Sequence, residues 1–413
     1  MEMQVFDFEE PLKFNVIEFE EKGNKVDLVK VEALLGGEMK EIYRQDEMGN
    51  RVAVIDPIET TKVQVTISAS EKGVTIKKVK FSFVEFLVRE NKLNVSAYMA
   101  GPFSDGLLNS FDERLAVTTE IILIGYINFD DKGNLVHRNG YEFLDRDIAA
   151  LKEGIKQQNA KTKILMCFGN FEGEKENADK VFSTKEIRAN FIKQAIDFIK
   201  KYDLDGADID FEYPANKKQW DGYSKVLVEF KKELLKLNLP LSIALPSWGV
   251  ELSAEAIKAV DEVQMMQYDL FDEKRRHAPF EVFAYGIEYF QKIGFPKEKL
   301  YPGLALYGRE KDVNAEERWL SYEGICMMYD LIDANTNEMD NSYFTGKTMN
   351  RDKTFYALLK GCGGIMLFQY ACDLPFENEL SIFRGVSEII NGFVKIEAPK
   401  AKVEKPKAKV VET

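Results

Sequence analysis

Hydrophobic and polar side chains alternate one by one in several stretches near the start of the chain. Residues 62–68 and 74–81 show this alternation, and Val, Ile, Thr and Phe are frequent in both. Alternation places one set of side chains on each face of a strand, which is typical of half-buried antiparallel sheets. The pattern predicts a small β-rich domain, a sandwich or a barrel, over residues 1–90. No catalytic residue types cluster in this domain, so we expect an attachment or interaction module, or packing support.

The pattern changes near residue 93 to short apolar runs separated by longer amphipathic segments. Eight runs are predicted to be buried strands: Val95–Met99, Glu120–Ile127, Lys163–Phe168, Gly206–Glu212, Leu241–Leu245, Glu262–Tyr268, Leu300–Leu306 and Gly364–Phe368. The sequence Ser183-Thr184-Lys185-Glu186 matches a capping box that begins a helix. Eight such units predict an α/β fold, a closed (β/α)8 TIM barrel, over residues 93–395. An open doubly wound sheet is the alternative, but no Gly-x-Gly-x-x-Gly turn follows the first run.

Composition narrows the classes of function. Apolar residues make up 45% and charged residues 30% of 413 residues, which excludes wholesale disorder. Lys and Arg total 56 against 69 Asp and Glu, and the net charge of −13 argues against nucleic acid. It fits a neutral or a cationic ligand, such as an uncharged sugar polymer, without choosing between the two. There is no apolar run of about 20 residues, so no membrane span is expected. The segment 396–413 contains Pro-Lys-Ala-Lys-Val twice and is predicted to be a disordered Lys/Pro tail.

The start of the chain lacks the basic and then apolar build of a secretory signal. We therefore expect synthesis in the cytoplasm, and action outside the cell after lysis or release by a non-classical route. The four cysteines have no Cys-x-x-Cys spacing and are expected to be reduced, packed thiols. Two histidines, His137 and His277, offer little material for a zinc site or a Ser-His-Asp triad.

Three acidic residues occupy alternate positions of the predicted strand 206–212. Asp208, Asp210 and Glu212 therefore share one face, which in a barrel is the interior, with Glu212 at the mouth. Three carboxyl groups in a partly dry lumen cannot all ionise cheaply, so their pKa values must separate. This predicts a protonated Glu212 able to act as a general acid. The alternatives are a divalent metal site and a structural network of buried acids, but we expect no metal.

These residues resemble a known family. The stretch 205–212 is similar to the DGxDxDxE signature of glycoside hydrolase family 18, the chitinases and their relatives. Further along, 266–269 resembles the MxYD of the sixth strand, 303–309 resembles GLPxYGR of the seventh, and 363–366 resembles the start of the eighth. The order and spacing agree over residues 93–390.

The resemblance implies retaining, substrate-assisted hydrolysis of β-1,4-linked N-acetylglucosamine polymers, chitin or its oligosaccharides, without a cofactor. Glu212 would protonate the glycosidic oxygen, and the substrate's own acetamide oxygen would attack the anomeric carbon. Asp210 would hold the acetamide N–H with support from Asp208, Tyr268 would bind the acetamide oxygen, and Asp269 would hold the distorted sugar. The alternatives are cleavage of peptidoglycan or an N-glycan core, and a non-catalytic chitin-binding lectin.

The sequence departs from the family pattern at three places. The SxGG turn of the third strand is Cys167-Phe168-Gly169-Asn170, and the usual Trp at the end of the eighth strand is Phe368. The segment between Arg309 and Gly363 is short, so we expect no α+β insertion and a shallow cleft that favours endo action. Candidate substrate-binding residues, besides Asp269 and Phe368, are Met266, Tyr98, Tyr126, Trp248 and Arg309; Tyr307, Trp319 and Tyr370 are further aromatics that could line the groove.

The absence of a leader sits awkwardly with an extracellular polymer as substrate. One hypothesis is that residues 1–90 dock the hydrolase onto a larger assembly, such as a phage or an injection particle.

Overall fold

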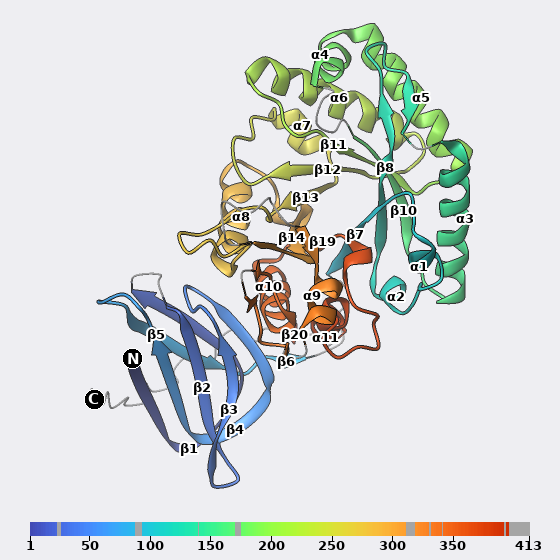
Figure 1. Cartoon of the computed structure of the whole chain (residues 1–413). Coiled ribbons are helices and arrows are strands. Elements are labelled where there is room, and N and C mark those ends of the chain that lie inside the picture. The colour runs from blue at the N-terminus through green and yellow to red at the C-terminus, as the bar shows by residue number, and fades with distance from the viewer. Residues whose placement is uncertain are drawn as a thin grey trace.

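The computed structural model describes residues 1–22, 26–86, 93–138, 140–169, 175–310, 319–329, 332–340, 342–391 and 394–395. It contains an N-terminal antiparallel sheet and a closed barrel surrounded by helices (Figure 1). The predicted tail, 396–413, lies outside the described residues.

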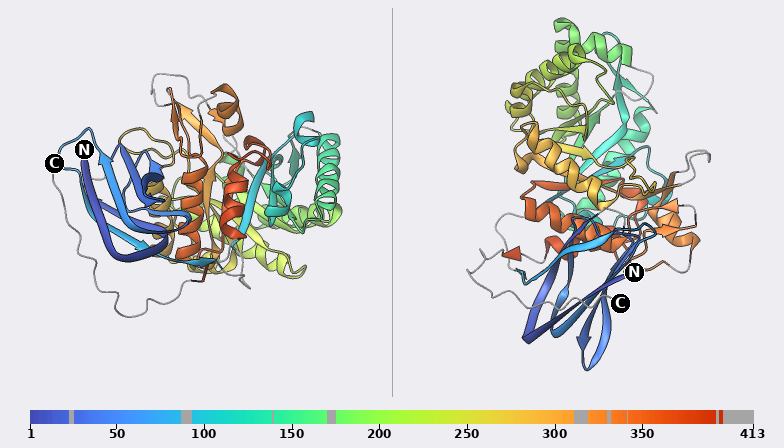
Figure 2. Two further views of the ribbon diagram at one scale, coloured as in Figure 1. Left: turned by 90° about the horizontal axis from the view of Figure 1, so that it is seen from below. Right: turned by 90° about the vertical axis from the view of Figure 1, so that its left-hand side faces the viewer.

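The N-terminal sheet has five strands in the order β3-β2-β4-β1-β5. The strands are β1 (Glu2–Lys22), β2 (Leu28–Leu35), β3 (Glu38–Gln45), β4 (Val52–Ser68) and β5 (Thr75–Ser82). The alternation seen in the sequence is real, because Val63, Val65 and Ile67 are all buried. The β-rich region is thus confirmed, but it is a single sheet that curves along its length and not a two-sheet sandwich or closed barrel (Figure 2). Shifts of register along the β1–β4 pair accompany this curvature.

Eight parallel strands close into a barrel, as the sequence predicts. They are β7 (Asn94–Ala100), β8 (Glu120–Phe129), β10 (Lys163–Phe168), β11 (Gly206–Asp210), β12 (Leu241–Pro246), β13 (Glu262–Met266), β14 (Leu300–Ala305) and β19 (Gly364–Phe368). Closure comes from β10, which pairs with both β8 and β11. Three strands are shorter than predicted, since β11 ends at Asp210, β13 at Met266 and β14 at Ala305. Glu212 and Tyr268 therefore lie just past their strands, at the barrel mouth.

Helices surround the barrel. The longer ones are α3 (Tyr141–Gln157), α4 (Lys175–Ser183), α5 (Lys185–Tyr202), α6 (Lys217–Leu235), α8 (Phe280–Lys292), α10 (Lys347–Lys360) and α11 (Ile382–Ile390). The shorter ones are α1 (Asp105–Leu108), α2 (Arg114–Val117), α7 (Ala254–Ala259), η1 (Lys297–Lys299) and η2 (Tyr370–Cys372). Within the described part of the chain, no helix is long and apolar enough to cross a membrane.

Two local predictions are wrong. The capping box at residues 183–186 does not form, because Ser183 ends α4, and Thr184 precedes α5 without a side-chain capping bond. An insertion is also present between β14 and α10, contrary to expectation. It comprises β15 (Tyr307–Glu310), β16 (Trp319–Ser321), β17 (Glu338–Met339), β18 (Ser342–Tyr343) and α9 (Tyr322–Met328), and its four strands form one sheet. Two minor pairings complete the fold: β8 with β9 (Leu135–His137), and β6 (Glu85–Phe86) with β20 (Val394–Lys395).

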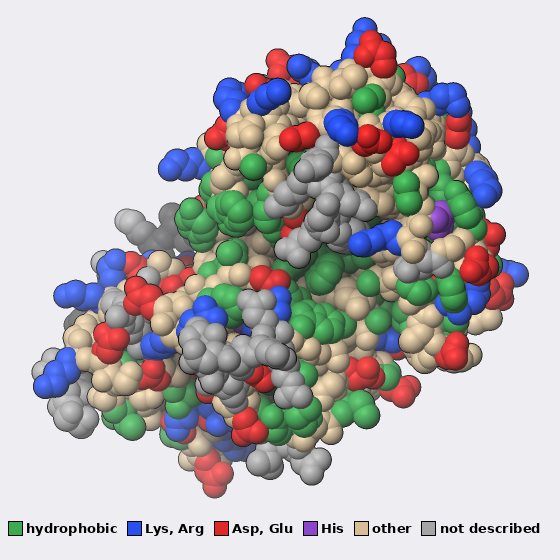
Figure 3. All heavy atoms as spheres, turned by 45° about the horizontal axis from the view of Figure 1, so that its top comes forward, with side chains coloured by type: hydrophobic (Ala, Val, Ile, Leu, Met, Phe, Trp, Pro, Cys, Tyr) green, Lys and Arg blue, Asp and Glu red, His purple; other side chains and the backbone are tan. Residues whose placement is uncertain are grey.

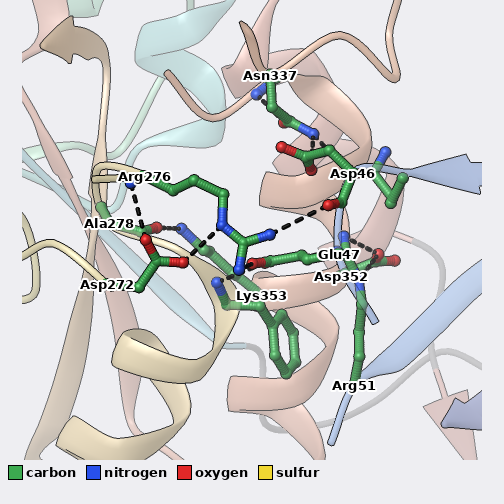
Figure 4. A network of polar contacts seen from close by, with 12 residues as sticks. Asp46, Glu47, Arg51, Asp272, Arg276, Ala278, Asn337, Asp352 and Lys353 are labelled. Carbon is green, nitrogen blue, oxygen red and sulfur yellow. Dashed lines mark hydrogen bonds and ion pairs between the residues drawn. The ribbon is translucent and has the colours of Figure 1, made fainter. Parts of the chain in front are cut away.

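Buried charges join the N-terminal sheet to the barrel. Asp352 on α10 is fully buried and accepts hydrogen bonds from Arg51 Nη2 at 2.7 Å and from the Tyr43 hydroxyl at 2.7 Å. Its second oxygen accepts from the Val54 backbone N–H at 2.9 Å. Arg51 is itself fully buried, and its charge is compensated by Asp352 at 2.7 Å and by the more distant Glu47 at 3.7 Å (Figure 4).

We predict that Asp352→Ala lowers the free energy of unfolding by about 3–5 kcal/mol, because the buried Arg51 guanidinium loses the carboxylate that accepts its hydrogen bonds and keeps only the more distant Glu47. Chemical unfolding followed by circular dichroism measures the change. Asp131→Ala is the matched control, since Asp131 forms an exposed ion pair with Lys180, and we expect it to cost less than about 1 kcal/mol. Equal losses in the two variants would contradict this account of the interface.

Candidate active site

A pocket opens at the carboxyl ends of the barrel strands. Its lining residues come from β7, β8, β19 and the ends of β11, β12 and β13: Tyr98, Ile124, Asp210, Glu212, Tyr213, Ala244, Met266, Tyr268, Asp269 and Phe368. Figure 3 shows hydrophobic side chains gathered in a hollow near the middle of the face it presents. The structure thus brings together Asp210, Glu212, Tyr268, Asp269, Met266, Tyr98 and Phe368, all predicted from sequence.

The acid strand β11 carries its carboxyl groups up the barrel interior. Asp208 is fully buried and Asp210 is 6% exposed, whereas Glu212 is half-buried at the mouth. The Tyr98 hydroxyl donates to Asp208 Oδ2 at 3.1 Å. Burial raises the pKa of Asp208 from its ordinary 3.8 to about 6, although hydrogen bonds with Ser242, Cys167 and Tyr98 act in the opposite direction.

Asp210 lies between the other two acids and is affected by both. Burial raises its pKa well above the ordinary value, and the negative charges of Glu212 and Asp208 raise it further. Among the residues the structure describes, one Asp210 oxygen has no hydrogen-bond partner. The column of Asp208, Asp210 and Glu212 therefore carries fewer than three negative charges near neutral pH. The unpaired oxygen belongs to a residue that lines the pocket.

Aromatic rings line the same pocket as these acids. Tyr268 and Phe368 stack with centroids 5.2 Å apart and planes at 29°, and Tyr98 lies 5.8 Å from Phe368. Burial raises the pKa of the Tyr268 hydroxyl well above its usual range, and the charges of Tyr307, Asp210, Glu212 and Asp269 act in the same direction. Tyr268 is consequently a protonated hydrogen-bond donor throughout the neutral range.

The pKa of Asp269 is shifted downward, opposite to the shifts of Asp208 and Asp210. Partial burial acts to raise its pKa, but the nearby His277 ring and the hydrogen bond and positive charge of Arg309 outweigh burial, so the pKa lies below its usual range. Arg309 Nε donates to Asp269 Oδ1 at 2.7 Å, and the Asp269 backbone N–H donates to His277 Nε2 at 2.9 Å. Asp269 has a φ of 56°, a left-handed conformation that costs about 1–2 kcal/mol and must be held by such contacts.

Tyr126, a predicted substrate-binding residue, does not line the pocket. Its side chain is fully buried outside the barrel lumen, where its hydroxyl donates to Asp147 of α3. The reason is a bulge in β8: Leu123 pairs with Met166 and Ile127 with Phe168, and Gly125 between them has a φ of 93°. The bulge reverses the alternation of faces, so Tyr126 points away from the pocket.

Other candidates lie at the edge of the pocket or away from it. Trp248 is 51% exposed and contacts Tyr213 edge to face at 5.1 Å, which places it beside the pocket rim. Arg309 contacts Asp269, and Tyr307 stacks on Trp319 at 5.1 Å in the insertion sheet. Tyr370 is fully buried beside Arg114, away from the pocket. Asn170 of the altered third-strand turn lies outside the described residues.

The sequence analysis missed two residues at the site. Tyr213 lines the pocket and directly follows Glu212, so adjacency was the available signal. His277 is fully buried and holds the Asp269 backbone, which no motif could indicate. All four cysteines are free, as predicted. Burial raises the pKa of Cys167 well above its usual range, so it stays a thiol beside Asp208. Within the described ranges, no cluster of His, Cys, Asp or Glu is arranged to hold a metal ion.

Comparisons with known proteins place this geometry in context. The family model described as "Glycosyl hydrolases family 18" matches residues 96–373. Similar curated proteins include "Probable chitinase 2" of Drosophila melanogaster, 28% identical over 176 residues, covering 38% of this chain and 36% of that protein. Others are "Endochitinase" of Manduca sexta, 23% identical over 39% of this chain and 34% of that protein, and "Oviduct-specific glycoprotein" of Homo sapiens, 26% identical over 38% and 27%. The matches thus span well under two thirds of these relatives.

Solved structures share the fold over more of the chain. The GH18 chitinase ChiB of Flavobacterium johnsoniae has a TM-score of 0.62 and 25% identity, covering 73% of this chain and 94% of that chain. A class V chitinase from Nicotiana tobaccum has a TM-score of 0.62 at 16% identity, covering 72% of this chain and 99% of that chain, and shows the fold alone.

We predict that Asp208→Asn flattens the dependence of stability on pH. The pKa of Asp208 is about 6 in the folded state and 3.8 ordinarily, so between these values the folded protein holds a proton that the unfolded chain has lost. The free energy of unfolding of the wild type therefore falls as pH rises through this range. The loss amounts to about 2 kcal/mol between pH 4 and 7. In the variant the charge of Asp208 no longer raises the pKa of Asp210, which flattens the dependence further. Urea unfolding at both pH values measures it. Asp221→Asn, at an exposed ion pair with Lys217, is the control; identical slopes in all three proteins would contradict the raised pKa.

Proposed function

The chain belongs to glycosyl hydrolase family 18, and from this premise we propose that it hydrolyses β-1,4-linked N-acetylglucosamine polymers, chitin or chitin oligosaccharides, with retention of configuration. The observation that carries the proposal is one pocket lined by Asp210, Glu212, Tyr268 and Asp269. The names of the chitinase relatives are consistent with this substrate class.

Each residue has a part in the proposed reaction. Glu212 gives its proton to the glycosidic oxygen as the bond to the anomeric carbon breaks. The acetamide carbonyl oxygen of the sugar bonds to that carbon and forms an oxazolinium ion, while Asp210 accepts a hydrogen bond from the acetamide N–H and Tyr268 donates one to its oxygen. Glu212, now a carboxylate, takes a proton from water as the water oxygen bonds to the anomeric carbon and the bond from that carbon to the acetamide oxygen breaks. Water enters on the face that the leaving group left, so the configuration is retained.

The electrostatics of the pocket support these parts. The unpaired oxygen of Asp210 suits an amide N–H donor, since a buried acceptor gains most when it is satisfied. Its raised pKa lets it share a proton with Asp208 in the free enzyme and carry charge once the positive oxazolinium ion forms. Asp269, ionised and paired with Arg309, remains an acceptor for a sugar hydroxyl.

Phe368 provides the floor under the sugar in this proposal. Phe368 is half-buried and lines the pocket, so its ring offers a face for C–H stacking, with less area than Trp and no N–H donor. Endo action stays a prediction, because the absence of an insertion, from which the sequence favours it, is not found: the insertion sheet is present. Docking of the N-terminal region onto a larger assembly stays a prediction.

A second candidate within the enzyme class is cleavage of the N-acetylglucosamine bond in peptidoglycan or in an N-glycan core, favoured by the replacement of Trp by Phe368. The Asp269 of the MxYD motif favours chitin instead. Comparing product release from chitin, cell-wall sacculi and a high-mannose glycoprotein separates them, and we expect the greatest turnover on chitin oligosaccharides. A non-catalytic lectin would bind the oligomers in calorimetry and release nothing from any of the three.

We predict that wild type cuts the chitin pentamer and hexamer and that Glu212→Gln lowers kcat by several orders of magnitude, about 4 kcal/mol or more of barrier, because Gln cannot donate the proton. Product analysis by chromatography measures the rates. Glu186→Gln on the exposed face of α5 is the matched control and should keep the wild-type rate. Equal rates in wild type and Glu212→Gln would remove Glu212 from the mechanism.

A further inference from the structure

The segment after β13 folds into a tight hairpin, here called the rim hairpin, residues 269–278. The Ala278 N–H donates to the Leu270 carbonyl at 2.8 Å, and Phe271 bridges to His277. Asp269, Arg275 and Ala278 have φ values of 56°, 61° and 49°. Three left-handed non-glycine residues in one short hairpin persist only where surrounding contacts hold them.

The base of the rim hairpin forms part of the pocket. His277 Nε2 accepts the Asp269 N–H at 2.9 Å, and the same nitrogen lies 3.5 Å from Asp269 Oδ1. The His277 ring packs 5.0 Å from Tyr307. The orientation of Asp269 therefore depends on where the second strand of the hairpin places His277.

The β3–β4 loop of the N-terminal sheet holds that second strand. Arg276, next to His277, donates to the Asp46 carbonyl at 3.1 Å and pairs with Glu47 Oε2 at 3.4 Å (Figure 4). The other oxygen of Glu47 accepts the Phe280 N–H at 2.9 Å, at the start of α8. Glu47 and Arg276 are both buried, so this contact is shielded from water and salt.

Two further contacts fix the hairpin from outside. Lys274 at its tip donates to Asp27 Oδ1 of the N-terminal region at 2.5 Å. Lys353 of α10 donates to the carbonyl of Ala278 at 2.6 Å. The left-handed residue Ala278 is thus held by the helix that also carries Asp352, the carboxylate bound by the N-terminal sheet (Figure 4).

From these contacts we infer that the N-terminal sheet is a positioning element for the active site: Glu47, through Arg276 and the rim hairpin, sets the orientation of Asp269. This inference rests on the proposed function for its catalytic consequence. It assigns to the N-terminal region a role in the chemistry itself, besides any attachment.

The test uses the full-length protein and three variants. Glu47→Gln removes the negative charge that the N-terminal sheet places beside Arg276, while the ion pair of Arg276 with Asp272 inside the hairpin, at 2.6 Å, stays in place. Asp27→Asn weakens the surface contact to Lys274 at low risk to folding. Arg44→Gln is the matched control, because Arg44 joins the same sheet to Asp333 of the insertion at 3.3 Å instead of to the hairpin. Hydrogen–deuterium exchange of peptides covering 267–281 and hexamer kinetics are the two readouts.

We expect Glu47→Gln to speed exchange over 267–281 and to leave β12 unchanged, with Asp27→Asn shifting exchange in the same direction by less. We expect kcat on the hexamer to fall roughly tenfold to a hundredfold with a smaller change in KM. Combined with Asp269→Asn, the losses should be less than multiplicative, because both act through one carboxylate. Arg44→Gln should match wild type in both readouts.

Unchanged exchange over 267–281 in Glu47→Gln and Asp27→Asn would overturn the inference even in an active enzyme. Fully multiplicative losses would overturn it too, since Glu47 would then act independently of Asp269. If exchange is faster in the two variants but the wild type cuts no N-acetylglucosamine oligomer, the proposed function is refuted and the positioning of Asp269 stays supported. Should Glu47→Gln fail to fold, Asp27→Asn alone decides between these outcomes.

Discussion

The stacking of carboxyl groups along β11 is the constraint on which the rest of the site depends. Asp208 and Asp210 are buried in the barrel lumen, where water cannot stabilise their charges, and Glu212 stands above them at the mouth. Ionising all three would cost several kcal/mol, so protons are retained low in the column. Hydrogen bonds from Tyr98 and Cys167 lower the pKa of Asp208 and so limit the rise that burial causes. A buried column of this kind lowers stability, and its presence makes chemical sense at a site where positive charge develops.

A second acid, Asp269, is held in the opposite state by the opposite means. Its charge is maintained by Arg309, and its strained backbone by His277. One pocket therefore contains carboxyl groups whose pKa values are raised and lowered, a separation typical of sites that move protons. The buried ion pairs between the N-terminal sheet, the rim hairpin and α10 are poor sources of stability in themselves. Their geometry fixes the hairpin in one arrangement, which connects the two parts of the fold to the chemistry.

The sequence predicts those features that arise from strong local patterns. The eight buried runs and the acid strand were recognisable because parallel barrel strands are continuously apolar and carry their functional residues at their carboxyl ends. Tyr126 was not predictable, because the bulge at Gly125 reverses the faces of β8 without changing its composition. The capping box failed because α4 occupies Ser183. Contacts such as Glu47 with Arg276 join residues far apart in sequence, and no local pattern reports them.

The central claim is that Glu212 and the substrate acetamide together cleave the glycosidic bond from this acid column. Proton NMR of the chitin hexamer in the first minutes of digestion tests it most directly, because the anomeric signals show the configuration of each newly formed reducing end before mutarotation. The account predicts reducing ends in the β configuration, as retention requires. Reducing ends formed in the α configuration would contradict the acetamide mechanism, and a hexamer left intact would contradict the substrate assignment.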